Sequence, residues 1–399
     1  MTSDVFNTTL GDLSFGGKGY YGIGASAVPY SPELYTYLRI TDINDDGTLN
    51  KSDLKSVSDE KASDYLLKPN DIVFARTGAS TGRNYFYDGT DGEFVYAGFL
   101  IKFSLDPSKV NPRYVKYHCQ SQVYRDWIAA FNTGSTRGNI NAQTLASMPI
   151  SLPDRENQDR IVKILDSLEN RRRYNKQIND NLEQQAQSYF QELFVDNADP
   201  EWTTGTISDL GVVVGGSTPS KAKPEYYTES GIAWITPKDL SINKSKFVSH
   251  GENDITELGL KNSSAAIMPE GTVLFSSRAP IGYIAIAAGE VTTNQGFKSV
   301  VPKPEIGTPF VYFFLKNTLP VIEGMASGST FKEVSGSTMK NVPAVIPDAE
   351  TLAKFSDFCA PIFAQQRILE EQNQSLATLR DNLLPKLMSG EIDVSAVQL

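Results

Sequence analysis

The apolar residues of this chain follow two different spacings, which divide the sequence into two kinds of segment. Short apolar runs at 71–74 (DIVF) and 272–275 (TVLF) are bounded by Gly and Pro, a pattern that predicts short strands and turns. Within the first of these regions, residues 111–131 favour a helix. Residues 156–194 and 350–388 instead place apolar side chains about every 3.5 residues, and each follows a Pro-Asp start signal. They predict two long helices.

Each predicted long helix carries a narrow apolar seam. The seam positions are Ile161, Ile164, Leu168, Ile178, Leu182, Tyr189 and Leu193 in the first helix, and Phe355, Phe358, Ile362, Leu369, Leu376, Leu379, Leu383 and Leu387 in the second. We expect the two helices to pack on each other, antiparallel, as a coiled coil. The alternative is that each helix only covers the core of its own domain. Pro361 and Pro385 indicate kinks, or a shorter element, in the second helix.

The sequence is an internal repeat. Residues 132–156 align with 326–350 at an offset of 194, and both share a Gly-Ser-Thr and a Pro-Asp pair. Further upstream, residues 69–82 align with 269–282 without a gap. A period this long is not that of a solenoid, so one domain-plus-helix unit is used twice.

These patterns predict an α+β chain of two similar β-rich globular domains with two long helices and a pseudo-two-fold internal repeat. A helix of about 39 residues is just under about 60 Å long, which exceeds the roughly 34 Å turn of B-DNA. Two domains held on such a rod could contact two sites on one duplex. The expected segments are a first domain at 1–152, a first helix at 153–195, a second domain at 196–346 and a second helix at 347–399.

Composition places the chain among globular proteins, with 40% hydrophobic and 21% charged residues. No apolar run approaches the roughly 18 residues of a membrane-spanning helix, and the first residues do not resemble a signal peptide. Two cysteines exclude a disulfide scaffold or a Cys-rich zinc site and suggest a reducing cytoplasm.

The net charge of −10 at first argues against a nucleic-acid partner. However, residues 1–150 carry 14 basic and 16 acidic groups, and residues 200–346 carry 12 and 13. Most of the negative charge therefore lies on the long helices and their flanks, and the two domains are nearly neutral. We expect the isolated chain to bind DNA weakly, with partners supplying much of the positive surface.

Three motifs resemble functional sites, but in each case the surrounding sequence favours a structural explanation. Residues 17–22 form a GxGxxG without the strand and helix of a dinucleotide site, so a Gly-rich loop is expected. The 42–53 segment places Asp, Asn, Asp, Gly and Asp as in an EF-hand loop, but it follows a strand-like run. We favour an Asp-Gly turn there and leave calcium binding open. His118 beside Cys119 favours packing, and no catalytic constellation or metal site is apparent.

Polar loops recur in both halves of the sequence. Residues 75–83 align with 275–282, residues 134–137 align with 328–331, and 293–298 adds an Asn-Gln pair. Arg pairs with guanine, Asn and Gln pair with adenine, and Ser and Thr bind phosphates, so these loops could contact DNA. Ordinary turn residues are the alternative, and repetition alone does not separate the two.

The ends of the two helices carry a family resemblance. Residues 384–392 (LPKLMSGEI), with 152–158 (LPDRENQ), resemble the specificity subunit of bacterial type I restriction–modification systems, as do the two domains each followed by a long helix. The resemblance covers essentially the whole chain. It implies two target recognition domains, each reading half of a split, asymmetric DNA sequence, with an antiparallel helical spacer between them. One departure is Thr351-Leu352 where the first unit has Asn157-Gln158, which puts symmetric partner docking in doubt.

The resemblance also implies partners and a division of labour. The subunit would be cytoplasmic, non-catalytic and free of cofactors and metal. It would bind double-stranded DNA and two modification subunits that use S-adenosylmethionine to methylate adenine. Restriction subunits that use ATP and Mg²⁺ for cleavage would join them. A protein-interaction scaffold of two modules on a coiled coil, with no DNA role, is the competing hypothesis, and strongly salt-dependent duplex binding would argue against it.

Carried onto this sequence, the resemblance implies two groups of site residues. The DNA-binding candidates are Arg76, Thr77, Ser80, Arg83 and Arg137 in the first domain, and Ser276, Ser277, Arg278, Asn294, Gln295 and Lys298 in the second. The partner-binding candidates, on helix faces expected to be exposed, are Arg171, Arg172, Glu370 and Glu371.

Overall fold

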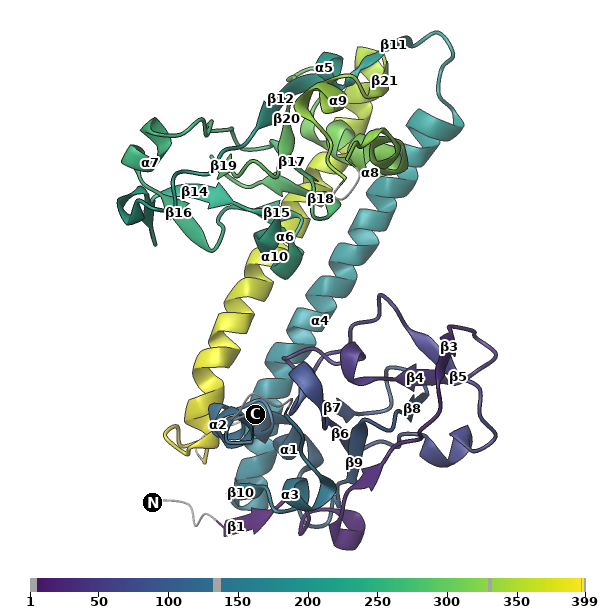
Figure 1. Ribbon diagram of the computed structural model, residues 1–399, viewed down its shortest axis with the longest axis vertical. Helices are drawn as coiled ribbons and strands as arrows, with labels where there is room; N and C mark the ends of the chain where they lie inside the picture. The colour runs from purple at the N-terminus through teal and green to yellow at the C-terminus, as the bar shows by residue number, and fades with distance from the viewer. Residues whose placement is uncertain (1–5, 132–137, 329–331, 396, 398–399) are drawn as a thin grey trace. The chain divides into compact units, whose positions relative to one another are not determined.

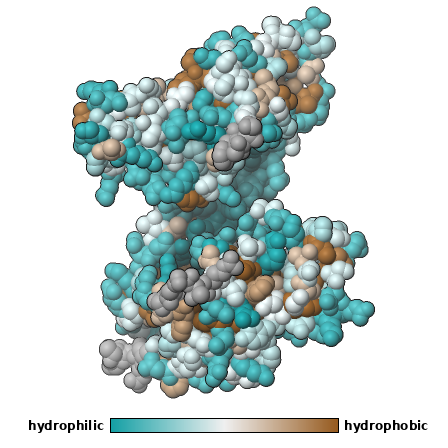
Figure 2. Space-filling view, viewed as in Figure 1, coloured by the Kyte–Doolittle hydropathy of each residue, from teal (hydrophilic) through white to brown (hydrophobic). Residues whose placement is uncertain are grey.

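The computed structural model describes residues 6–131, 138–328, 332–395 and 397. The chain divides into two compact units (Figure 1). Unit 1 consists of Met1–Arg171 and Leu376–Leu399, and unit 2 of Arg172–Ser375. Hydrophilic and hydrophobic side chains are mixed over the visible face of each unit (Figure 2).

The described residues of unit 1 form two four-stranded sheets and a two-stranded ribbon. The sheet order is β2-β9-β6-β7 for the first, β3-β5-β4-β8 for the second, and β1-β10 for the ribbon. The strand bounds are β1 Phe6–Thr9, β2 Tyr20–Tyr21, β3 Ala27–Pro29, β4 Thr36–Leu38, β5 Lys55–Val57, β6 Asp71–Ala75, β7 Asn84–Tyr87, β8 Phe94–Tyr96, β9 Leu100–Ser104 and β10 Pro149–Leu152.

Strand β6 lies at the centre of unit 1 and is buried on both faces. Ile72 and Phe74 belong to one apolar cluster, and Val73 and Ala75 belong to another on the opposite face. Because side chains alternate across a strand, a strand between two cores needs apolar residues at every position. This explains the unbroken apolar run that the sequence showed here.

The helix expected over residues 111–131 is wrong as a single element. The structure has α1 (Pro112–His118) and α2 (Gln122–Ala129), followed after a gap by α3 (Ala142–Ala146). Ser121 separates α1 from α2 because its hydroxyl accepts from the Tyr124 N–H and caps the new helix. His118 and Cys119 are buried, as expected for packing residues, and burial lowers the pKa of His118 to about 4.

Unit 2 repeats the strand order of unit 1 and adds one strand, β15, at the edge of its first sheet. Its sheets run β12-β20-β17-β18-β15 and β13-β16-β14-β19, beside a β11-β21 ribbon. The parallel pair β4–β8 recurs as the parallel pair β14–β19, and the flanking pairs are antiparallel in both units. The bounds are β11 Thr203–Thr206, β12 Gly211–Gly215, β13 Tyr227–Thr228, β14 Ile232–Ile235, β15 Phe247–Val248, β16 Asn253–Ile255, β17 Val273–Ser277, β18 Ile281–Ala287, β19 Thr292–Thr293, β20 Lys298–Pro302 and β21 Pro343–Ile346.

Short helices cover the sheets of unit 2, and two long helices run through both units. The short ones are α5 Ile207–Leu210, α6 Pro237–Ile242, α7 Glu257–Lys261, α8 Thr308–Met325 and α9 Gly336–Lys340. The long ones are α4 (Arg155–Gln191), which ends in a π-helical turn over Glu192–Asp196, and α10 (Ala349–Met388). No helix in the described part of the chain is long and apolar enough to cross a membrane.

Helix α10 passes through both of its prolines as one element of 40 residues. The shorter element that Pro361 and Pro385 indicated is therefore wrong. Apolar side chains on either side of these prolines, including Phe355, Ile362 and Leu384, are buried in the unit cores. That packing holds the helix where proline costs it a backbone hydrogen bond.

Both long helices contribute to the core of each unit. In unit 1, Leu165 of α4 and Leu384 of α10 share one apolar cluster. In unit 2, the Phe190 and Phe355 rings lie 5.8 Å apart between centroids. Also in unit 2, Asn175 Nδ2 donates to Gln372 Oε1 at 3.3 Å, so rising residue numbers in α4 meet falling numbers in α10. Helix–helix packing and domain-core packing thus occur together.

A buried ionic cluster binds the sheets of unit 2 to both long helices. Lys246 Nζ, just before β15, donates to Glu183 Oε2 of α4 at 2.8 Å and to Gln366 Oε1 of α10 at 2.9 Å. The same ammonium lies 3.5 Å from the Phe363 ring centroid, and Lys316 Nζ of α8 reaches Glu183 Oε1 at 2.5 Å. Burial lowers the pKa of Lys246 to about 8. Burial would raise the pKa of Glu183, but Lys246 and Lys316 outweigh it and lower that pKa to about 2.

We predict that Glu183→Gln destabilises the chain by about 3 kcal/mol, because it leaves the buried Lys246 ammonium without its counter-charge. Urea unfolding followed by circular dichroism measures the change. The folded-state pKa of Glu183 lies below the ordinary value of 4.5, so its stabilisation is complete above that pH and is lost as the pH falls toward 2. Glu371→Gln, on an exposed face of α10, is the matched control; equal unfolding midpoints for the two variants would contradict the prediction.

Candidate nucleic-acid interface

Three backbone segments of unit 1 meet where β6 ends. The Arg76 N–H donates to the Phe99 carbonyl at 3.0 Å, and the Ile140 N–H donates to the Arg76 carbonyl at 2.9 Å. The Thr81 hydroxyl donates to the Gly138 carbonyl at 3.0 Å. The residues after β6, the turn at 97–99 and the segment from 138 therefore form one surface.

Arg76 is the cation at the centre of this surface. Its guanidinium stacks on the Tyr21 ring, 4.9 Å from the centroid, and its Nε is buried without a hydrogen-bond partner. The Tyr21 hydroxyl is itself fixed by accepting from the Ala142 N–H at 3.2 Å. Among the described carboxylates, none forms an ion pair with Arg76. An oriented guanidinium without a counter-charge is suited to a phosphate or a guanine edge.

The other first-unit candidates are placed differently. Arg83 donates from Nε to Asp45 Oδ1 at 2.6 Å and from Nη1 to the Ile43 carbonyl at 3.2 Å, so it holds the 42–53 turn. Thr77, which follows Arg76 in the chain, and Ser80, three residues further on, are partly exposed. Arg137 lies outside the described residues.

The segment at 42–53 forms the expected turn. Asp46 accepts from both the backbone and the hydroxyl of Thr48, at 3.0 and 2.6 Å. Asp42 pairs with Arg39 at 2.6 Å. Each carboxylate thus has its own partner in the protein, and no three described His, Cys, Asp or Glu side chains come together as metal ligands.

In unit 2, the structural counterpart of Arg76 is Ser277. The Ser277 N–H donates to the Gly296 carbonyl at 2.7 Å, and the Val334 N–H donates to the Ser277 carbonyl at 3.0 Å, repeating both backbone bonds of Arg76. The ungapped alignment of the sequence placed Ser276 there, one residue away. A residue with left-handed backbone precedes each of these strands: Asn70 at φ 75° before β6 and Gly271 at φ 84° before β17. Gly271 also lies one residue beyond the position that the ungapped alignment gives for Asn70.

Two second-unit candidates are wrong as base-reading residues. Ser276 and Ser277 are fully buried. The Ser277 hydroxyl donates to the Gly296 carbonyl at 3.0 Å. The Ser276 hydroxyl donates to the Pro280 carbonyl at 2.9 Å and accepts from the Tyr283 N–H at 2.7 Å. Both hydroxyls stabilise the fold and are not presented to a ligand.

Two of the four remaining second-unit candidates lie near Glu333. Arg278 Nη1 lies 3.5 Å and Lys298 Nζ 3.8 Å from its carboxylate oxygens. Burial lowers the pKa of Lys298, and Glu333 offsets this in part. Asn294 Oδ1 accepts from the Gly296 N–H at 2.8 Å and shapes the turn. Gln295 is exposed and accepts from the Thr218 hydroxyl through Oε1.

The partner-binding candidates share no common environment. Arg171 and Glu371 are exposed, and Arg172 is partly buried with an unpartnered Nε. The expectation that Glu370 lies on an exposed helix face is wrong. Its carboxylate accepts from the backbone N–H of Lys246 at 2.8 Å and of Phe247 at 3.0 Å, so it anchors β15 to α10.

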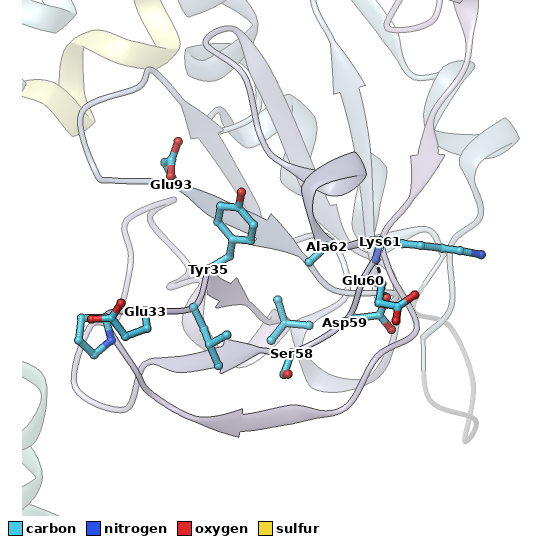
Figure 3. Close-up of a pocket in the computed structure, with 11 residues that line it drawn as sticks. Glu33, Tyr35, Ser58, Asp59, Glu60, Lys61, Ala62 and Glu93 are labelled. Carbon is cyan, nitrogen blue, oxygen red and sulfur yellow. Dashed lines mark hydrogen bonds between the residues drawn. The ribbon is translucent and has the colours of Figure 1, made fainter.

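Two features were missed by sequence reasoning. Phe99 is 59% exposed beside Arg76, and only its place in an Ala-Gly-Phe turn could have drawn attention to it. The second is an open hollow of about 900 Å³ in unit 1, where Glu33 and Glu93 lie near Tyr35 (Figure 3). Asp59 and Glu60 also line it, against a single lysine, so its charge does not suit a phosphate backbone.

Comparisons with known proteins agree on one family. The profile of the type I restriction modification DNA specificity domain matches residues 24–184 and 200–379. The MjaIX specificity subunit of Methanocaldococcus jannaschii is 39% identical over 191 residues, which span 46% of this chain and 44% of that subunit. The HindI specificity subunit of Haemophilus influenzae is 23% identical over 404 aligned positions, covering 82% of this chain and 87% of that one.

A solved structure shares the fold. The S subunit of a type I restriction–modification system from M. genitalium superposes with a TM-score of 0.59 at 17% identity, covering 97% of this chain and 96% of that chain. At this identity, the likeness concerns the fold.

We predict that Glu333→Gln strengthens duplex binding by about two- to fivefold at low salt, because it frees Arg278 and Lys298 from a competing carboxylate. Fluorescence anisotropy of the full chain with a labelled duplex, over a salt titration, measures the affinity and its steeper salt dependence. Glu323→Gln, exposed on α8, makes the same change in net charge elsewhere in unit 2. An equal gain from both variants would show that only net charge matters.

Proposed function

The chain belongs to the family of type I restriction modification DNA specificity domains, and we propose that it reads a bipartite, asymmetric DNA target, one half with each unit. One observation carries this proposal: the two matched ranges fall on two copies of one strand order. Each copy also forms the same backbone bonds at the end of its central strand, β6 or β17. A duplicated reader with different side chains at this position suits two different half-sites.

We propose that α4 and α10 form an antiparallel coiled coil that sets the gap between the half-sites. The contacts within unit 2 that pair rising with falling residue numbers support this, as does the shared core of the two helices in unit 1. At about 1.5 Å per residue, the 37 residues of α4 span about 55 Å, more than one turn of B-DNA.

Catalysis is assigned to partners in this proposal. Modification subunits would methylate adenine with S-adenosylmethionine, and restriction subunits would use ATP and Mg²⁺ for cleavage. The exposed Arg171 and Glu371 are the helix-face residues that remain candidates for docking them. The nearly neutral domains support weak duplex binding by the isolated chain, with partners adding positive surface.

We predict that exchanging residues 1–150 for the corresponding domain of another family member changes one half of the methylated motif and leaves the other half unchanged. Each half-site would depend on contacts from one unit only. Sequencing that maps methylated adenines in cells carrying the partner subunits measures the motif.

The reciprocal exchange of residues 200–346 is the matched control and should change the other half. A methylated motif that did not split into two parts would contradict the proposal. If the assembled complex showed no salt-dependent DNA binding, the protein-interaction scaffold would be favoured instead.

We predict that deleting one heptad from each long helix, residues 169–175 with residues 372–378, shortens the gap and leaves both half-sites intact. The deletion removes Asn175 together with its partner Gln372, so the remaining contacts keep their register. It also removes the docking candidate Arg171, so Arg171→Ala in helices of full length is the control for lost docking and should leave the gap unchanged. Seven helical residues correspond to about 10 Å, so the gap should shrink by at most about three base pairs. The same mapping of methylated adenines reads the gap; a single-helix deletion, which breaks the register, should abolish methylation.

A further inference from the structure

One three-residue turn is built identically in both units. It comprises residues 97–99 between β8 and β9, and residues 294–296 between β19 and β20. The Ala97 N–H donates to the Leu38 carbonyl at 3.0 Å, and the Asn294 N–H donates to the Ile235 carbonyl at 3.0 Å. The far end of each turn is held by the end of the central strand, through the Arg76 and Ser277 N–H groups.

A second chain segment presses against each turn and fixes its backbone. A Cβ on Gly22 would lie 2.2 Å from the Ala97 carbonyl oxygen, and a Cβ on Gly216 would lie 2.0 Å from the Asn294 carbonyl oxygen. Both positions therefore require glycine. The Ile23 N–H also donates to the Tyr96 carbonyl at 3.1 Å, as the Ser217 N–H does to the Thr293 carbonyl at 2.8 Å.

The side chains on these two turns are different. Where unit 1 has Gly98 followed by Phe99, unit 2 has Gln295 followed by Gly296. Phe99 is 59% exposed, and Gln295 is exposed with only its Oε1 bonded to Thr218. One rigid backbone thus presents an apolar ring in one unit and a primary amide in the other.

Phe99 is joined to the unpaired cation through the backbone, because the Arg76 N–H donates to the Phe99 carbonyl at 3.0 Å. Arg76 directly follows β6 and Phe99 directly precedes β9, and the last pair between these two strands is Ala75 with Leu100. Tyr21 is paired with Ile101 and stacks on the Arg76 guanidinium. A single exposed Phe is ordinary on a protein surface. Here the exposed ring belongs to the residue whose carbonyl accepts from the Arg76 N–H, and no described carboxylate pairs with the Arg76 guanidinium. An exposed ring and an unpaired cation on neighbouring residues point to an anionic ligand with an apolar group.

We propose that the 97–99 turn discriminates bases in the first half-site, with Phe99 packing on the 5-methyl group of a thymine in the major groove. The inference rests on the proposed function and deepens it. Thymine is the base that offers an apolar group there, and Phe is among the side chains that contact it. Arg76 binds the adjoining guanine or phosphate, and Gln295 is the counterpart in unit 2, with an amide suited to adenine.

The test uses the assembled complex with its partner subunits and duplexes of its mapped methylation motif. Each thymine of the first half-site is replaced in turn by deoxyuridine, which removes only the methyl group. For the unaltered chain, we expect one such replacement to weaken binding about fivefold, the effect of burying about one methyl group. Phe99→Ala should weaken binding to the thymine duplex by a similar factor and should be insensitive to that replacement.

Three controls make the outcome specific. Phe99→Leu, which keeps an apolar side chain, should retain part of the methyl discrimination. Tyr30→Ala removes another aromatic of unit 1 that is 55% exposed and should leave the discrimination intact. Replacements in the second half-site should affect the unaltered chain and Phe99→Ala equally.

Two results would overturn the inference: no thymine position responds in the unaltered chain, or Phe99→Ala keeps the full response. Either one leaves the proposed function standing, provided that the methylated motif still splits into two halves. A motif in one block would instead reject the proposed function itself.

Discussion

The fold depends on one constraint: a long helix with a narrow apolar seam cannot bury that seam alone. Helix α4 meets this constraint twice, contributing Leu165 to the core of unit 1 and Phe190 to the core of unit 2. Helix α10 does the same in the opposite chain order. Unit 1 is consequently completed by the last residues of the chain, 376–399, and is not a contiguous stretch of sequence. Either unit without its share of both helices would expose an apolar surface.

Several cations are paired with carboxylates inside each unit. Lys246 is buried in an ion pair with Glu183, and Arg83 forms an ion pair with Asp45. Paired charges of this kind orient structure and offer little to an outside ligand. Arg76 differs because aromatic stacking on Tyr21 orients it without neutralising it. A nearly neutral domain can therefore still present a specific cation to DNA, which the net charge of the chain does not reveal.

The sequence predicted those features that depend on local patterns. The seam spacing predicted both long helices, and the Asp-Gly pair predicted the turn that Asp46 closes. The sequence did not predict which side chains are withdrawn from the surface by a hydrogen bond to a backbone group far away along the chain. Ser277 is buried because its hydroxyl bonds Gly296, and Glu370 is withdrawn from the surface by two N–H groups of the β15 segment. The break at Ser121 was a local signal, a helix cap within an otherwise helical pattern, that was overlooked.

The duplicated turn is a means by which one fold could read two sequences. Its backbone is fixed from three directions, by the neighbouring strand, by the end of the central strand and by a glycine that leaves no room for a side chain. Substitutions at Gly22 or Gly216 would displace the turn itself, whereas the Phe99 side chain is 59% exposed and the exposed Gln295 side chain bonds the Thr218 hydroxyl. Where the backbone is held by neighbouring segments and the side chain is exposed, a substitution changes the side chain at little cost in stability. Separating the fixed backbone from the variable tip is what allows specificity to change while the domain continues to fold.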